Sequence, residues 1–281
     1  VTQFSILFKI LVTIFSVGFG YISFEYFSAI KFFRSEVYVI ILFLVFGIVT
    51  ALDSADFITF YLGLELQSIC FYIFIAFDKA YKSVQSTLVY FVYSILSSAI
   101  LLFGISLVYY STGSTNFYDI SLLNIANCYS FDSTYTFFSR ISGFIVIFAF
   151  FFKIGSFPFQ FWVPEVYDLG DFFPISFLGT VSKLFGFGVF FKLSSVLFFF
   201  SLPTLIYVLH ISGSISRAYG VIGGLVQTNV RRLLGFSSIA HTGYIMLIFS
   251  AGTIESFVYA VFYLIGYVLS VSSIFIFFLS I

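Results

Sequence analysis

The sequence predicts an all-α polytopic membrane protein, and three observations support this prediction. Phe, Tyr, Ile, Leu and Val dominate the 281 residues, and only 9% of all residues are charged. Apolar segments of about 20 residues, long enough to cross a bilayer as a helix, recur along the whole chain. One of these segments holds a lysine and, a few residues later, a glycine and a proline. A soluble domain with this pattern would lack a polar surface, so that class is excluded.

We expect about nine transmembrane helices. They are predicted at residues 4–23, 37–52, 57–77, 84–110, 141–163, 174–192, 203–226, 233–249 and 256–281. Residues 111–139 are predicted to form a polar loop. The first span is too long for the apolar core of a signal peptide and lacks a basic segment before it, so we expect it to be retained.

The loops on alternate sides carry unequal positive charge, which predicts the orientation. One side would hold Lys31, Arg34, Lys79, Lys82, Arg231 and Arg232, and the other would hold Arg140 and Lys192. Because loops rich in Lys and Arg stay in the cytoplasm or matrix, we expect the N-terminus outside and the C-terminus inside.

The fifth predicted span contains a charge and a break. Lys153 lies among about twenty nonpolar residues, and Gly155 and Pro158 follow it. An ammonium at bilayer depth costs about 2.5 to 3.5 kcal/mol, so it needs a partner or a hydrated cavity. Proline removes a backbone donor, so we expect the helix to lose its regular hydrogen bonds between Gly155 and Pro158 and to expose carbonyls to buried water. Broken helices of this kind mark transport sites.

Three ionisable residues are predicted to share the membrane midplane: Glu65 in the third span, Lys153 in the fifth and Lys183 in the sixth. We expect Glu65 and Lys153 to approach to salt-bridge or one-water distance. A static ion pair that only fixes helix packing is the alternative, but it leaves one lysine over. Burial disfavours the charged form of a lysine and a nearby carboxylate favours it, so a lysine between these influences can exchange protons.

Other polar residues have simpler interpretations. His241 is either a proton relay or a hydrogen-bonded packing residue, and packing is favoured for His210. Arg217 lies inside the seventh span, about ten residues from its basic end, too deep for its side chain to reach water easily. Lys9 is close enough to a span end to do so. Three acidic residues follow the break and are expected to form a solvated loop: Glu165, Asp168 and Asp171.

Composition limits the cofactors and partners. Cys70 and Cys128 are isolated, so they provide no disulfide framework, zinc site or iron–sulfur motif. Twelve acidic and twelve basic residues balance, which gives no sign of a nucleic-acid partner. The 46 Phe and 20 Tyr are typical of A+T-rich codons and hint at an organellar genome.

Four blocks carry a resemblance to a known family. Residues 56–68 read DFITFYLGLELQS, residues 152–167 read FKIGSFPFQFWVPEVY, and residues 227–241 read QTNVRRLLGFSSIAH. With Ser182-Lys183, these blocks resemble, in family order, the NADH dehydrogenase subunit 2 family, the antiporter-like membrane subunit of respiratory complex I. Gln160 and Glu165 depart from the His and Asp that are common in that family.

The resemblance implies an antiporter-like fold of two inverted five-helix repeats, each with a broken helix. Residues 1–36 would form an N-terminal helix and loop, residues 37–192 the first repeat, and residues 193–281 the first three helices of an incomplete second repeat. Either a separate chain completes that repeat or half of the proton path is lost.

The resemblance also implies a function, that of a proton-translocating, non-redox subunit of NADH:ubiquinone oxidoreductase in the mitochondrial inner membrane. Glu65, Lys153 and Lys183 would transfer protons, with His241 as a candidate relay. A tight Glu65–Lys153 pair would let Lys183 keep its proton, and an open pair would expel it.

No cofactor is expected on this chain, since NAD, FMN, iron–sulfur clusters and ubiquinone would sit on partner subunits. The expected partners are other membrane-arm subunits and a lipid such as cardiolipin. A stand-alone cation/proton antiporter and a structural subunit that no longer pumps are the alternatives.

Overall fold

The computed structural model describes residues 2–29, 36–77, 80–127, 133–197 and 202–280. Within these ranges the chain is almost entirely helical, and its extended pairing is an isolated bridge between Asp56 and Asn116. In chain order the helices are α1 (Thr2–Ala29), α2 (Glu36–Asp53), α3 (Phe57–Ile75), α4 (Tyr81–Thr112), α5 (Phe117–Asn127), α6 (Ser133–Ile154), α7 (Trp162–Leu169), α8 (Phe172–Gly179), α9 (Val181–Leu197), α10 (Leu202–Leu225), α11 (Val230–Phe249) and α12 (Ile254–Ser280).

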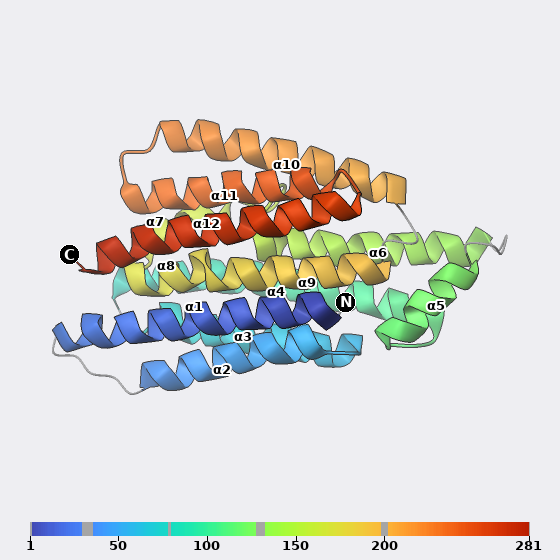
Figure 1. Cartoon of the computed structure of the whole chain (residues 1–281), viewed down its shortest axis with the longest axis horizontal. Helices are drawn as coiled ribbons and strands as arrows, with labels where there is room; N and C mark the ends of the chain where they lie inside the picture. Colours follow the sequence, from blue (N-terminus) through green and yellow to red (C-terminus); the bar gives the residue numbers. More distant parts are fainter. Residues whose placement is uncertain (1, 30–35, 78–79, 128–132, 198–201, 281) are drawn as a thin grey trace.

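The long helices run side by side along one axis, as a membrane bundle requires (Figure 1). In the described ranges, eight helical segments are long and apolar enough to cross a membrane. The fifth predicted span, residues 141–163, is not among these eight, because the structure divides it between α6 and α7. In Figure 1, α1 begins on the right and α12 ends on the left, so the described chain starts and finishes on opposite sides of the bundle. The predicted all-α membrane fold is confirmed.

The predicted polar loop at residues 111–139 is wrong in part, because α5 forms inside it. Phe117 and Ile120, three residues apart, share one face of this helix and are 7% and 0% exposed. The side-chain Oδ1 of Asn116 accepts a hydrogen bond from the Tyr118 amide at 2.9 Å at the start of the helix. Eleven residues are too few to cross a bilayer, and α5 lies obliquely across one end of the bundle (Figure 1).

A second helix break was not predicted. The sixth predicted span is interrupted at Thr180, which lies between α8 and α9 with φ −115° and ψ −70°. The Thr180 hydroxyl donates to the Ser176 carbonyl at 2.6 Å, a side-chain bond that competes with regular helix geometry. The segment from α8 into α9 is the most enclosed candidate span, with 89% of its residues buried. It packs against α1, α2, α6 and α12 and forms the centre of the bundle.

Two helix pairs cross closely at glycine. A Cβ atom on Gly63 of α3 would lie 2.9 Å from the Gly47 carbonyl oxygen of α2, and one on Gly243 of α11 would lie 2.7 Å from the Gly213 carbonyl oxygen of α10. Only glycine leaves room for backbones this close. This recurrence supports the two-repeat interpretation, which itself stays a prediction.

We expect Gly243→Val to destabilise the protein by about 1 to 3 kcal/mol, because the added methyl groups would force α10 and α11 apart. Gly266→Val on α12 is the matched control, since nothing lies within 4 Å of a Cβ atom there. Thermal unfolding in detergent measures both variants. Equal losses of stability would contradict a close α10–α11 crossing.

Candidate functional site

The site is built around the end of α6, where the predicted break is confirmed. Gly155 has φ +72°, a left-handed conformation that glycine adopts without strain. Its amide donates to the Phe152 carbonyl at 3.1 Å, and the Ser156 amide donates to the Phe151 carbonyl at 2.9 Å. These two bonds form a Schellman motif, which satisfies carbonyls that the helix end would otherwise leave free.

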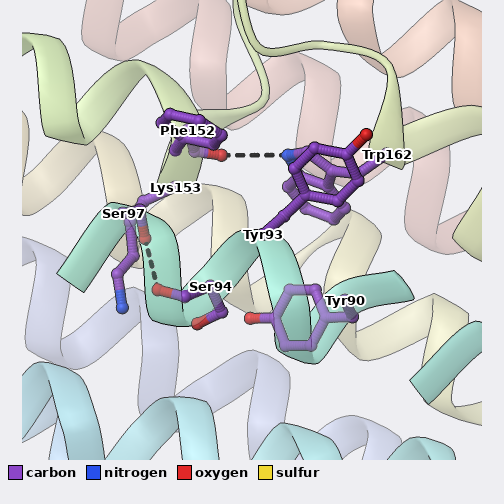
Figure 2. A pocket seen from close by; sticks show the side chains of 7 residues that line it. All are labelled: Tyr90, Tyr93, Ser94, Ser97, Phe152, Lys153 and Trp162. Carbon is purple, nitrogen blue, oxygen red and sulfur yellow. Dashed lines mark hydrogen bonds between the residues drawn. The ribbon is translucent and has the colours of Figure 1, made fainter. Parts of the chain in front are cut away.

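Two side chains from other segments also donate to carbonyls at the break. The Trp162 indole Nε1 of α7 donates to the Phe152 carbonyl at 3.1 Å, as Figure 2 shows. The Lys183 ammonium of α9 donates to the Ile154 carbonyl at 2.5 Å, and Lys183 is only 4% exposed. Protein donors therefore occupy these two carbonyls, and the predicted contact of carbonyls with buried water stays a prediction.

Lys153, the penultimate residue of α6, lines a small cavity beside this break. The cavity has room on the order of a single water molecule. Its other walls are Tyr90, Tyr93, Ser94 and Ser97 of α4, together with Phe152 and Trp162 (Figure 2). Hydroxyl groups both donate and accept hydrogen bonds, so this wall can bind an ammonium group or accept and pass on its proton. Sequence reasoning missed these groups, although the spacing of Tyr90, Ser94 and Ser97 places them on one helix face.

Glu65 lies on α3 with one carboxylate oxygen buried and without a hydrogen-bond partner. The other oxygen lies 3.5 Å from the Ser68 hydroxyl. The nearby Tyr72 interacts with Ser68 and with Ser94, which also lines the Lys153 cavity. The carboxylate therefore faces a polar region that reaches α4.

The expected salt bridge between Glu65 and Lys153 is not formed. Among the described residues, the ion pair within 4.0 Å joins Lys9 and Asp53 instead. Glu65 and Lys153 still interact electrostatically at longer range. Their separation reflects the backbone path, because Lys153 enters a cavity walled by α4 rather than crossing directly to α3. An approach through one water molecule stays a prediction.

His241 connects α11 to α12. Its Nδ1 lies 2.8 Å from the Tyr263 hydroxyl, and its ring centre lies 4.8 Å from that of Tyr267. The Tyr267 hydroxyl donates to the Gly179 carbonyl at 3.3 Å, at the end of α8 and close to the Thr180 break. Through these contacts the two tyrosines connect His241 to the end of α8, which directly precedes α9, the helix that carries Lys183. Two tyrosines four residues apart in the last span were the overlooked signal.

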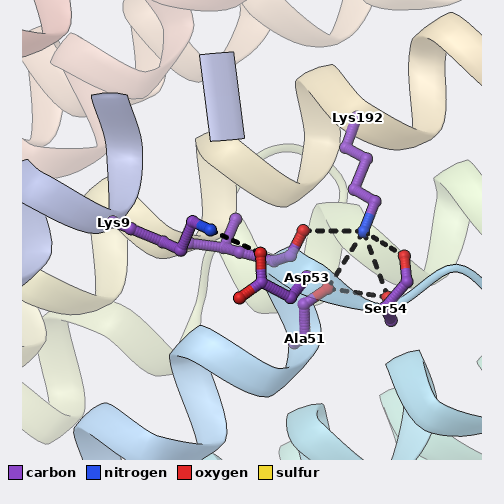
Figure 3. Close-up of polar contacts among 6 residues, drawn as sticks. Lys9, Ala51, Asp53, Ser54 and Lys192 are labelled. Atoms are coloured by element: carbon purple, nitrogen blue, oxygen red, sulfur yellow. Dashed lines mark hydrogen bonds and ion pairs between the residues drawn. The ribbon is translucent and has the colours of Figure 1, made fainter. Parts of the chain in front are cut away.

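Two further lysines, Lys9 and Lys192, make polar contacts at one end of α2 (Figure 3). Lys9, which was expected to reach the interface, pairs with Asp53 at 2.5 Å. Lys192, nine residues after Lys183 on α9, reaches the C-terminal end of α2. Its ammonium donates to the carbonyls of Ala51 at 3.3 Å, Leu52 at 2.8 Å and Ser54 at 2.5 Å.

The acidic segment after the break is more than the expected wet loop. Asp168 accepts a hydrogen bond from the Asn229 side chain, and Arg231 donates to the Gly170 carbonyl at 3.0 Å. These contacts attach the end of α7 to the start of α11. His210 lies 3.3 Å from the Ser250 hydroxyl, in accord with its expected packing role. Lys31, Arg34, Lys79 and Cys128 lie outside the described residues.

The fold and site together define a polytopic membrane protein with a helix that is broken inside the bundle. Residues 54–281 match the family described as NADH:quinone oxidoreductase/Mrp antiporter, transmembrane. The chain belongs to this family.

The relatives carry names from one enzyme. The chain is 31% identical over 252 residues to NADH-quinone oxidoreductase subunit N 2 of Koribacter versatilis, covering 89% of this chain and 50% of the relative. It is 34% identical over 256 residues to NADH-ubiquinone oxidoreductase chain 2 of Oenothera berteroana, covering 88% and 50%. The chain thus spans about half the length of these relatives.

Solved structures share the fold. A chain of respiratory complex I from Thermus thermophilus aligns with a TM-score of 0.75 at 23% identity, over 97% of this chain and 56% of that chain. A chain of the Mrp complex from Dietzia sp. aligns with a TM-score of 0.73 at 20% identity, over 84% and 25%. The complex I likeness covers more of both chains.

We expect Gly155→Ala to destabilise the protein by about 1 to 3 kcal/mol, because a left-handed conformation disfavours alanine. Its Cβ atom would also lie 2.6 Å from a Val163 methyl group. Gly143→Ala on α6 is the control, since its Cβ meets nothing within 4 Å and alanine favours a helix. Thermal unfolding should show opposite signs, and a shared sign would contradict the proposed role of the turn.

We expect Lys192→Met to destabilise the turn between α2 and α3 by about 1 to 3 kcal/mol, because buried carbonyls lose a donor. Hydrogen exchange should accelerate at the amides of Phe57 and Phe117, which bond to the carbonyls of Thr115 and Ala55 and so join this turn to the segment before α5. The control is Lys9→Met, which breaks an ion pair whose side chains are 24% and 51% exposed. Such pairs contribute about 0 to 1 kcal/mol, so an equal acceleration in the control would contradict the assignment.

Proposed function

We propose that this chain is a proton-translocating, non-redox membrane subunit of an NADH:quinone oxidoreductase. One observation carries the proposal: two lysines from different helices meet at a single helix break. The Lys183 ammonium donates to the Ile154 carbonyl. Lys153, the residue before Ile154, lines a cavity that is walled in part by hydroxyl groups. Ionisable residues inside a membrane typically mark proton or ion paths. The names of the relatives support NADH and a quinone as the source of energy.

Lys183 can exchange a proton without losing its structural contact. An ammonium has three donors, and only one is needed for the Ile154 carbonyl. A neutral amine still has two N–H groups and gains a lone pair. Lys183 can therefore cap α6 in both protonation states, and the helix break does not have to reorganise each time a proton moves.

Lys153 is suited to control Lys183. Its ammonium forms no ion pair among the described residues, and the carboxylate with which it interacts electrostatically, Glu65, lies beyond ion-pair distance. If the two approach, the Lys153 charge is compensated and Lys183 retains its proton. If they separate, repulsion between the two lysines favours proton release from Lys183. His241, linked through Tyr263 and Tyr267, is the proposed relay onward.

The remaining assignments follow from the same proposal. The chain would act in a proton-translocating NADH:ubiquinone reductase, a translocase, together with other membrane-arm subunits and a lipid such as cardiolipin. NAD, FMN, iron–sulfur clusters and ubiquinone would bind partner subunits. The proposed location is the mitochondrial inner membrane, with the N-terminus toward the intermembrane space.

We expect Lys183→Ala and Lys183→Gln to reduce the protons translocated per NADH by at least about tenfold, since neither side chain titrates. Glutamine keeps an N–H donor for Ile154, so Lys183→Gln should assemble more completely than Lys183→Ala. Proton uptake by vesicles containing the whole assembly is measured against NADH oxidation, with native gels for assembly.

The control is Lys82→Gln, an exposed lysine at the start of α4. It should leave the proton yield unchanged. A normal yield in Lys183→Gln would remove Lys183 from the path. Proton transport without any associated NADH-oxidising assembly would favour the stand-alone antiporter instead.

A further inference from the structure

Arg217 is a cation at membrane depth that the proton path does not use. It lies on α10, whose candidate span is Leu205–Leu225, and its side chain is exposed. Eight residues separate Arg217 from Leu225, which corresponds to about 12 Å along a helix. The guanidinium is therefore close to the middle of the span, on the outer surface of the bundle.

The close helix crossing explains why this side chain points outward. The backbone nitrogen of Arg217 would lie only 2.6 Å from a Cβ atom on Gly243, so α10 and α11 leave no space between them there. The guanidinium instead lies over the Tyr244 ring, 5.7 Å from its centre. A cation–π contact at an exposed position compensates only part of the cost of a charge in hydrocarbon.

The described structure offers Arg217 no anion. Neither α10 nor α11 contains an Asp or Glu, and α12 has only Glu255, in its first turn. Among the described residues, no ion pair involves Arg217. Arginine does not lose its proton in proteins, so it cannot escape the cost by becoming neutral.

A lipid phosphate is a poor partner at this depth. Phosphates lie outside the hydrocarbon core of about 30 Å, and the distance from Arg217 to the nearer end of its span exceeds the length of an arginine side chain. A carboxylate on a transmembrane helix can lie at the same depth. It also matches the two parallel N–H groups of a guanidinium.

The neighbouring residues form a mixed surface suited to such a helix. His210, Ser214, Arg217 and Val221 follow one another at intervals of three or four residues, which places them on one face of α10. His210, Arg217 and Val221 are exposed, and Tyr244 of α11 borders them with 37% exposure. We call these five residues the Arg217 surface.

We propose that the Arg217 surface docks a transmembrane helix of another polypeptide, which presents an Asp or Glu carboxylate to Arg217. The proposal rests on the proposed function in one respect, that the other polypeptide is a neighbouring subunit of the same membrane assembly. The interaction would fix where the two subunits meet, while Lys153 and Lys183 move protons inside the bundle.

Photo-crosslinking in native membranes tests the occupant. A photoreactive amino acid replaces Val221, one turn from Arg217, and the crosslinked peptide is identified by mass spectrometry. The expected product is a transmembrane peptide of another polypeptide with Asp or Glu within one turn of the crosslinked residue. A product with lipid alone, with a second copy of this chain, or with a peptide that lacks a carboxylate would overturn the proposal.

Charge variants test the interaction itself. Arg217→Gln should lower the crosslink yield by about tenfold, whereas Arg232→Gln, at an exposed arginine in the first turn of α11, should leave it unchanged. Arg217→Glu should abolish the crosslink, and exchange of the partner carboxylate for arginine should restore it. Restoration keeps the test decisive even if single variants assemble poorly, and its failure would refute the ion pair. Both readouts are independent of proton yield, so they separate this proposal from the proposed function.

Discussion

The bond between the Lys183 ammonium and the Ile154 carbonyl is the contact on which the interior of this bundle depends. A helix that stops inside a membrane leaves carbonyls that lipid cannot satisfy. The Gly155 turn satisfies some of them locally, and Trp162 and Lys183 supply donors from other segments. Because Lys183 belongs to the most enclosed helix, this bond joins the break to the centre of the fold. Under the proposed function, the side chain that exchanges a proton is therefore also the one that satisfies the broken helix.

The same helix uses a second lysine in a similar way, with a different consequence. Lys192 donates to carbonyls at the C-terminal end of α2, as Lys183 does at the end of α6. The C-terminal end of a helix carries partial negative charge, so a cation is stabilised there. Lys192 lies near the end of its span and next to the Lys9–Asp53 pair, where water is close. Lys183 is only 4% exposed, so water screens its charge less than it screens the charge of Lys192.

The sequence predicted those features of the structure that depend on residues close together in the chain. Gly155 and Pro158 predicted the break, apolar length predicted the spans, and the isolated charges identified Glu65, Lys153 and Lys183. The errors concern contacts between distant segments. Nothing near Thr180 in the sequence indicates that its hydroxyl competes with the backbone, and the partners of Lys192 are about 140 residues away. The Glu65–Lys153 distance depends on how α4 packs between the two elements, which periodicity does not reveal.

Lysine and arginine differ in whether they can lose their charge inside a membrane. A lysine can become neutral when its surroundings no longer support a charge, so it can sit in a cavity with no fixed anion, as Lys153 does. An arginine keeps its charge in every state of the protein, so a midspan arginine requires a permanent anion. This difference is consistent with both proposals, in which Lys153 and Lys183 exchange protons and Arg217 makes a lasting contact with a carboxylate of a neighbouring helix.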